Sequence, residues 1–294
     1  MFNKILVPLD GSTLAEQVLS PVEELARAFN SEVVLVGVCE QDEHKEGHMC
    51  RIYINSEAEQ LRSNLAGSTS SVKTVVLTGK PAEKILHYAE ENDVDLIVMA
   101  SNGRSGIASW SLGGTVQKVL HRVGVPLIIV RVQETPGESG RVGLFDRILM
   151  PLDGSERGEA ALPDVAELTK RLKSEVILLQ VVEPGRYVHS ARGLEYIPFK
   201  DLNMDSMKRK AQEYLDGASS KLAGTKVIVR REVRIGDCAR EIIKFDDEIG
   251  CSLIAMASHG HSGIERWIHG SITSKILQSG NRSVLFVLSP TVHG

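Results

Sequence analysis

The chain has 294 residues, of which 42% are hydrophobic and only 4% aromatic, and its formal net charge is −4. This length suits two domains of ordinary size. The charges are mixed along the chain, which excludes the clustered Lys and Arg of a nucleic-acid-binding tract, and no apolar run is long enough to span a bilayer.

Short, nearly continuous apolar runs rich in β-branched residues predict strands that are covered on both faces. In the first half of the chain these runs are Lys4–Leu9, Glu32–Val38, Val72–Leu77, Asp95–Ala100 and Pro126–Val132. In the second half they are Arg147–Leu152, Glu175–Val182, Lys226–Arg234, Ser252–Ala257 and Ser283–Leu288.

Amphipathic stretches between these runs predict helices. Those of the first half are Thr13–Phe29, Pro81–Glu91 and Thr115–Val123. Those of the second half are Ser155–Leu172, a charged helix near Asp205–Leu222, Ala239–Glu248 and Ile272–Gln278. The alternation of strands and helices predicts an α/β fold with parallel sheets and right-handed crossovers.

The chain contains an internal repeat. Ile5–Ser12 returns as Ile148–Ser155, 143 residues later, and Met99–Ile107 returns as Met256–Ile264, 157 residues later. A repeat of this length indicates duplicated domains rather than a solenoid. We expect a first domain at 1–135 and a second at 144–294, joined by a linker that is rich in glycine and contains Pro136.

The two halves are expected to differ most between their second and third strands. Because the offset rises from 143 to 157 there, the second half carries 14 extra residues. It has Gly185–Leu202 in this connection, where the first half has a shorter polar loop at Glu40–Gly47. Function varies in loops on a fixed scaffold, so the copies are expected to differ in what covers their sites.

The four cysteines are Cys39, Cys50, Cys238 and Cys251, and none of their spacings is CxxC. The pattern predicts neither a zinc knuckle nor a dithiol redox motif. The start of the chain shows no apolar signal-peptide core. We therefore expect a cytoplasmic protein with reduced thiols.

Both halves place an Asp-Gly-Ser after the first strand and a small-residue loop after the fourth. Ligands of open parallel sheets bind outside the carboxyl ends of the strands, so the two segments face one crevice if those strands are neighbours. Glycine N–H groups can form an anion-binding concavity, and Gly270-Ser271 opens a helix whose N-terminus favours phosphate. Asp153 is a good acceptor for ribose hydroxyls or an adenine amino group. The combination predicts a nucleotide site.

Neither the P-loop pattern nor the GxGxxG dinucleotide fingerprint occurs in the chain. The readings as a P-loop NTPase and as a dinucleotide oxidoreductase therefore lose their main support.

These motifs resemble those of the universal stress proteins. The resemblance rests on the opening Ile5–Ser12, on the strand Asp95–Ser101, and on a glycine, Gly260, followed by nine residues and Gly270-Ser271. It covers the chain twice. It implies two Rossmann-like (adenine nucleotide alpha hydrolase-like) domains, each a five-stranded parallel sheet of order 3-2-1-4-5 flanked by helices. It also implies a bound ATP or AMP, held by the aspartate, a backbone group near the end of strand two and the glycine loop.

Carried onto the second half, the resemblance assigns nucleotide contacts to Pro151, Leu152, Asp153, Val181, Met256, Ala257, Ser258, His259, Gly260, His261, Gly263, Gly270, Ser271, Ile272 and Thr273. Ala257 stands where the family pattern has a glycine. In the first half the matching positions are Pro8, Leu9, Asp10, Val38, Met99, Ala100, Gly103, Arg104, Gly106, Gly113, Gly114 and Thr115.

Structural readings stay open for several of these residues. Asp10 and Asp153 could instead cap helices or form turns. His44, His48 and Cys50 have a loosely metal-like spacing, but with no fourth ligand in sight a flexible loop is expected rather than a metal site.

The sequence predicts a stress or regulatory protein that binds adenine nucleotide, and no efficient enzyme, since no catalytic dyad accompanies the loop. The resemblance implies that the two domains pair along their fifth strands, Leu127–Val130 and Val284–Leu288. A homodimer and Mg²⁺ alongside ATP are open options. Two alternatives also stay open: a protein-interaction module without a nucleotide, and an enzyme that consumes ATP, as a slow ATPase or a transferase.

We predict that the second site binds ATP more tightly than the first, because Ser271 and Thr273 become Gly114 and Val116 in the first half. Each lost hydroxyl donor is worth about 0.5–1.5 kcal/mol if it bonds the phosphate. Titration calorimetry on Asp10→Ala and Asp153→Ala variants tests the ranking. The larger loss of affinity is expected from Asp153→Ala, and the opposite order would refute it.

Overall fold

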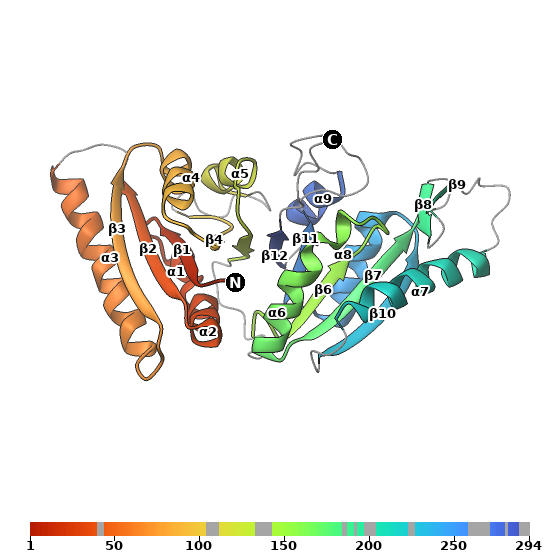
Figure 1. Ribbon diagram of the computed structural model, residues 1–294. Coiled ribbons are helices and arrows are strands. Elements are labelled where there is room, and N and C mark those ends of the chain that lie inside the picture. Colours follow the sequence, from red (N-terminus) through yellow and green to blue (C-terminus); the bar gives the residue numbers. More distant parts are fainter. Residues whose placement is uncertain are drawn as a thin grey trace. The chain divides into compact units, whose positions relative to one another are not determined.

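The structure is a computed structural model of the whole chain. It describes residues 1–39, 44–103, 112–132, 143–183, 187–190, 193–196, 204–222, 227–257, 271–279 and 282–287. The chain divides into two compact units, Met1–Arg141 and Val142–Gly294, and each contains a parallel sheet with helices on both faces (Figure 1).

In the first unit the sheet has the hydrogen-bonded order β3-β2-β1-β4-β5, and all four neighbouring pairs are parallel. Its strands are β1 (Lys4–Leu9), β2 (Glu32–Cys39), β3 (Ser71–Thr78), β4 (Leu96–Ala100) and β5 (Leu127–Val130). Its helices are α1 (Thr13–Glu16), α2 (Leu19–Phe29), α3 (His44–Asn64), α4 (Pro81–Glu91) and α5 (Gly114–Leu120).

The second unit repeats this plan with the parallel order β10-β7-β6-β11-β12. Its strands are β6 (Arg147–Pro151), β7 (Glu175–Val182), β10 (Ile228–Ile235), β11 (Leu253–Ala257) and β12 (Ser283–Val287). A separate antiparallel pair, β8 (Tyr187–Ser190) and β9 (Gly193–Tyr196), comes between β7 and β10 in the chain. Its helices are the 3₁₀ helix η1 (Gly158–Ala161), α6 (Leu162–Leu172), α7 (Met204–Ser220), α8 (Cys238–Ile249) and α9 (Ser271–Ser279).

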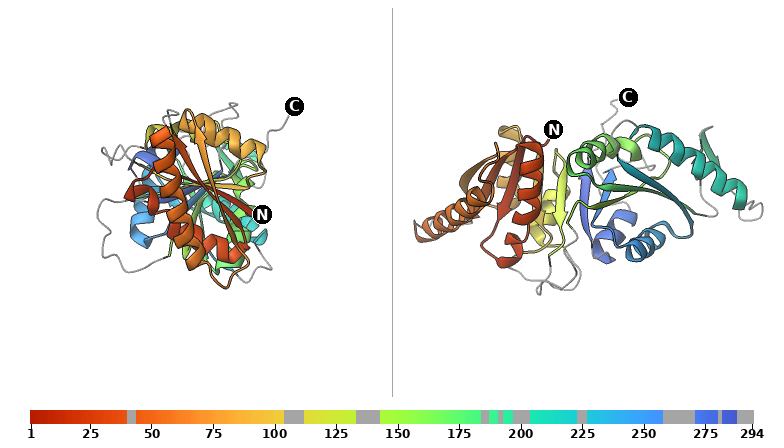
Figure 2. Two further views of the ribbon diagram at one scale, coloured as in Figure 1. Left: turned by 90° about the vertical axis from the view of Figure 1, so that its left-hand side faces the viewer. Right: turned by 90° about the horizontal axis from the view of Figure 1, so that it is seen from below.

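The central strands read as continuous apolar runs because both of their faces are covered. Ile5, Leu6 and Val7 of β1 are fully buried, as are Val33–Val36 of β2. Helices α2 and α3 contact each other on one face of the first sheet, and α4 contacts α5 on the other (Figure 2). Burying each such aliphatic side chain contributes about 1.5–3 kcal/mol. The predicted α/β class with parallel sheets is confirmed.

The prediction of one continuous long helix after the first strand of each half is wrong. The expected Thr13–Phe29 helix is broken into α1 and α2, and the expected Ser155–Leu172 helix opens as η1 before α6. A proline explains both breaks, since Pro21 and Pro163 have no N–H to donate to the carbonyl four residues earlier. The chain tightens there into i→i−3 bonds, such as Gln17 N–H to Leu14 O at 3.3 Å.

The connection after β2 differs from the polar loop predicted at Glu40–Gly47. Helix α3 already begins at His44 and runs to Asn64, and it was not predicted because its apolar stripe is thin. Among its described side chains, only those of Ile54, Ala58 and Leu61 are buried. They lie in its middle turns, where α3 contacts β2 and β3. In the second unit, the β8–β9 hairpin within the expected insertion was also not predicted.

Metal sites, disulfides and membrane spans can be examined in the part of the chain that the structure describes. Within the described ranges, no group of three or more His, Cys, Asp and Glu side chains is placed to hold a metal ion. All four cysteines are free thiols. Among the helices that the structure describes, none combines the length and apolar character needed to cross a bilayer.

The second unit buries an ion pair at the amino ends of β11 and β12. Asp246 of α8 is 1% exposed, and Arg282 Nε donates to its two carboxylate oxygens at 3.3 and 3.1 Å. The Cys251 thiol donates to the same carboxylate. Burial raises the pKa of Asp246, and the Cys251 hydrogen bond and the Arg282 charge oppose that rise. Arg282 is therefore the one cation that opposes the effect of burial on the Asp246 pKa among the causes of its shift.

Replacing Arg282 with Met is expected to lower the free energy of unfolding by about 1–3 kcal/mol, because it leaves a buried carboxylate without its cation. Denaturant unfolding measures the change. Lys244→Met is the control, since the Lys244–Glu248 pair is exposed and 4.0 Å long and should contribute less than about 0.5 kcal/mol. Equal losses in the two variants would contradict the assignment.

Candidate functional site

A cavity of about 740 Å³ opens at the carboxyl ends of β1, β2 and β4 in the first unit. This volume lies within the usual range for small-molecule sites. The predicted residues that line it are Pro8, Leu9, Asp10, Val38, Met99, Ala100, Gly103, Gly113, Gly114 and Thr115. Arg104 and Gly106 lie outside the described residues. Every described residue of the first predicted site thus borders one cavity.

The turn after β1 fixes one oxygen of Asp10. Gly11 adopts a φ of 83°, which favours glycine. Asp10 Oδ1 accepts from the Ser12 N–H at 3.0 Å and from the Ser12 hydroxyl at 2.6 Å. Ser12, not Asp10, is the N-cap of α1, because its Oγ accepts from the Ala15 N–H at 3.2 Å. Asp10 therefore holds the turn through Oδ1, while Oδ2 faces the cavity.

That second oxygen meets the loop after β4. A Cβ atom built on Gly103 would stand 1.9 Å from Asp10 Oδ2, far inside any real contact distance. A Cβ on residue 103 would force the Asp10 carboxylate to shift, so in this arrangement the loop approaches the carboxylate through bare backbone. Since β1 and β4 are hydrogen-bonded neighbours, the two sequence motifs meet at this point.

The glycine-rich segment ends at the start of α5. Gly113 is the N-cap, and its N–H donates to Ser101 O at 2.9 Å. This N–H therefore faces the protein, and an anion would be met by the first-turn N–H groups of α5, which have no intrahelical partner. Thr115 and Val116 both line the cavity, but the Val116 side chain is 4% exposed and supplies no donor.

The β2 side of the cavity is apolar and contains residues that sequence reasoning missed. Helix α3 contributes Met49, Cys50 and Tyr53, and β2 contributes Val36 and Cys39; Asn102, Pro81 and Ile85 also lie in the lining. The α3 residues were missed because this helix was not predicted. A tyrosine five residues before an Ala–x–x–Leu pattern would have been the available signal.

Tyr53 is hydrogen-bonded to helix α1, which follows the Asp10 turn. Its hydroxyl donates to Glu16 Oε1 of α1 at 3.2 Å. Burial raises the pKa of Tyr53, and the carboxylates of Glu16, Glu57 and Asp10 raise it further. Burial also raises the pKa of Glu57, with a contribution from Glu16. The phenol is therefore a neutral donor at neutral pH.

The second unit builds the same turn. Gly154 has a φ of 84°, and Asp153 Oδ1 accepts from the Ser155 N–H and hydroxyl at 3.0 and 2.6 Å. A Cβ on Gly158 would stand 2.4 Å from Asp153 Oδ1, where the first unit has Ala15. The turn is therefore packed more tightly against η1 than its counterpart is against α1.

The remaining predicted residues of the second site are placed only in part. Pro151, Leu152, Val181, Met256 and Ala257 lie at the carboxyl ends of β6, β7 and β11, and Ile272 and Thr273 lie in the first turn of α9. Strands β6 and β11 are hydrogen-bonded neighbours. Ser258, His259, Gly260, His261, Gly263 and Gly270 lie outside the described residues, as does the side chain of Ser271.

Comparison with known proteins identifies this arrangement. The model of the universal stress protein family matches residues 1–131 and again residues 144–287. The chain belongs to the universal stress protein family. It is 30% identical over 147 residues to the universal stress protein YxiE of Bacillus subtilis, a match that covers 49% of this chain and 99% of YxiE.

Longer relatives carry the match across both halves of this universal stress protein. The universal stress protein Rv2005c of Mycobacterium tuberculosis is 22% identical over 256 residues, covering 85% of this chain and 78% of Rv2005c. A crystal structure of a universal stress protein from Archaeoglobus fulgidus superposes with a TM-score of 0.68 at 20% identity, covering 98% of this chain and 99% of that one. At this identity the likeness establishes the fold.

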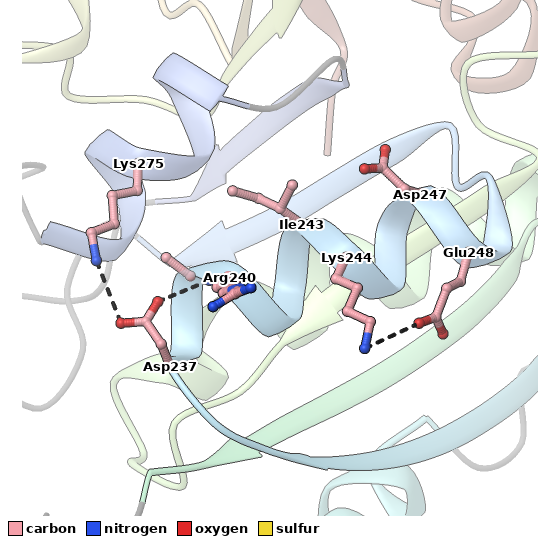
Figure 3. Close-up of a pocket in the computed structure, with 8 residues that line it drawn as sticks. Asp237, Arg240, Ile243, Lys244, Asp247, Glu248 and Lys275 are labelled. Atoms are coloured by element: carbon pink, nitrogen blue, oxygen red, sulfur yellow. Dashed lines mark hydrogen bonds and ion pairs between the residues drawn. The ribbon is translucent and has the colours of Figure 1, made fainter.

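A second hollow of this universal stress protein, about 700 Å³ in volume, runs along α8 of the second unit (Figure 3). Four of its charged groups form two ion pairs: Lys275 Nζ lies 3.5 Å from Asp237, and Lys244 Nζ lies 4.0 Å from Glu248. None of the predicted site residues lines it. The cleft at the strand ends is therefore the candidate site.

Replacing Gly103 with Ala is expected to cost about 1–3 kcal/mol of unfolding free energy, because the new methyl group overlaps the Asp10 carboxylate. Gly124→Ala is the matched control, since a Cβ there meets nothing within 4 Å. Chemical denaturation of both variants provides the comparison. If Gly103→Ala were as stable as Gly124→Ala, the close approach of the loop to Asp10 would be wrong.

Proposed function

We propose that this universal stress protein binds an adenine nucleotide, ATP or AMP, in the cleft of each unit. The observation that carries the proposal is the approach of Gly103 to Asp10 Oδ2 within a cavity of about 740 Å³. A carboxylate acceptor and a bare-backbone loop on neighbouring strands suit a ligand with donors at one end and an anion at the other.

The strand order sets the direction of the ligand. The ends of β2, β1 and β4 lie side by side in that order. The apolar β2 side, with Val36 and Val38, suits the adenine ring, and the β4 side, with Thr115 and the first turn of α5, suits the phosphates. Asp10 lies between them as an acceptor for a ribose hydroxyl or the adenine amino group. Mg²⁺ would enter with ATP on its phosphate oxygens.

Regulation rather than turnover is the activity that fits these residues. Among the described lining residues, Asp10 is the one carboxylate, and its Oδ1 is already bonded to Ser12. Efficient hydrolysis would need a group free to activate water. Occupancy of the cleft would instead favour one state of the protein that a partner recognises. The pairing of the two domains through their fifth strands, and a homodimer, stay predictions.

The double variant Asp10→Asn/Asp153→Asn tests the proposal. Asn keeps an acceptor for the Ser12 and Ser155 N–H groups but can present an NH₂ group to the ligand. Titration calorimetry should show ATP binding to the unaltered chain and at least a tenfold loss, about 1.4 kcal/mol, in the variant. Asp95→Asn is the control, because Asp95 accepts from Asn3 and Lys4 at the opposite end of β1.

Mass spectrometry of small molecules released from the purified chain extends this test to the natural ligand. An adenine nucleotide is the expected release product. An unaltered chain that neither releases nor binds any nucleotide would contradict the proposal and favour the alternative of a protein-interaction module.

A further inference from the structure

We propose that a tyrosine held beside a glutamate positions the nucleoside in each unit: Tyr53, which lines the cavity of the first unit, with Glu16, and Tyr214 with Glu159. This inference rests on the proposed function, because it concerns how the same cleft grips its ligand. Neither tyrosine belongs to the repeated motifs that point to the site.

The first unit shows how the pair is built. Tyr53 reaches the cavity from α3, and its hydroxyl donates to Glu16 Oε1 at 3.2 Å. Glu16 ends α1, the helix that opens directly after Asp10 and Ser12. A hydrogen bond to a carboxylate is stronger than one between neutral groups. The pair therefore ties α3 to the turn that carries Asp10 and fixes the orientation of the phenol ring.

The position of Tyr53 along the cleft follows from the sheet. Helix α3 packs on β2 and β3, whereas the glycine loop follows β4, and β1 with Asp10 lies between them. The lining neighbours of Tyr53 on this side are Met49, Cys50 and Val38. An aromatic ring among apolar side chains suits the face of a purine. Tyr53 therefore lies at the end of the cleft opposite the phosphate-binding segment.

The second unit carries the same pair on α7. The Tyr214 hydroxyl is buried and makes no hydrogen bond of good geometry with any described group. Glu159, whose side chain is 12% exposed, lies beside it, and the charges of Glu159 and Asp153 contribute to raising the pKa of Tyr214, after burial. Lys221 forms an ion pair with Glu159. Glu159 and Asp153 therefore lie close enough to act on the Tyr214 phenol electrostatically, as Glu16 and Asp10 act on Tyr53.

The two pairs occupy similar positions in their units, but the tyrosines do not follow the offset of the sequence repeat. Glu159 follows Glu16 by 143 residues, the offset of the Asp-Gly-Ser motif, but Tyr214 follows Tyr53 by 161 residues. The tyrosines lie in the connection that differs most between the halves, on helices that begin at His44 and Met204. Two connections of different length thus place a tyrosine near equivalent carboxylates, Glu16 in the first unit and Glu159 in the second. A role at the cleft explains this better than helix packing, which Ile54 and Leu215 already supply.

The experiment compares the affinities of adenosine and ATP in the variant Tyr53→Leu/Tyr214→Leu. Loss of the two rings should weaken both ligands by about tenfold, because stacking acts on the base that they share. Tyr53→Phe/Tyr214→Phe, which keeps the rings, should recover most of that loss. Thr115→Val should weaken ATP and leave adenosine unchanged. Tyr88→Leu is the control, since Tyr88 lies on α4 and is not among the residues that line the cavity.

A spectroscopic readout separates positioning from a purely structural role. The five tyrosines are labelled as 3-fluorotyrosine, and ¹⁹F spectra are recorded with and without adenosine. The signals of Tyr53 and Tyr214, assigned from the Phe variants, should shift, and the Tyr88 signal should not. Binding of ATP with unmoved Tyr53 and Tyr214 signals, or with unchanged affinities in the Leu variant, would overturn this inference alone. An unaltered chain that binds neither ligand would overturn the proposed function and this inference together.

Discussion

The candidate site depends on one close approach: the Asp10 carboxylate and the backbone of Gly103 lie where two neighbouring parallel strands end. A side chain on residue 103 would occupy the place of Asp10 Oδ2, so the loop after β4 comes this near only because it has no Cβ. The opposite oxygen is held by Ser12, which also caps α1. The turn, the cap and the loop therefore support one another, and the cavity forms around them.

The duplication shows which parts of this arrangement can vary. Both units keep the Asp–Ser turn with the same two hydrogen-bond lengths, 3.0 and 2.6 Å. They differ at the start of the helix after the glycine loop, where buried Val116 replaces Thr273, and in the connection after the second strand. Under the proposed function, the chain would thus preserve the acceptor for the nucleoside while changing the donors for the phosphates.

Most of the fold could be predicted because buried parallel strands leave an unmistakable apolar pattern; Lys4–Leu9 and Glu175–Val182 were predicted to the residue. The misses have physical causes. Pro21 and Pro163 interrupt helices whose apolar spacing looks continuous. Helix α3 is stabilised by contacts with β2 and β3 that its polar sequence does not display. Asp10 and Gly103 carried local signals, whereas Tyr53 reaches the site only through the packing of α3.

The most direct test of the central claim is a crystal structure of the full chain grown with ATP. The account predicts adenine against β2 and α3 of the first unit, Asp10 Oδ2 within hydrogen-bond distance of the nucleoside, and the phosphates at the first turn of α5. ATP bound with its phosphates on the β2 side, or in the hollow along α8 with the strand-end cleft empty, would contradict it.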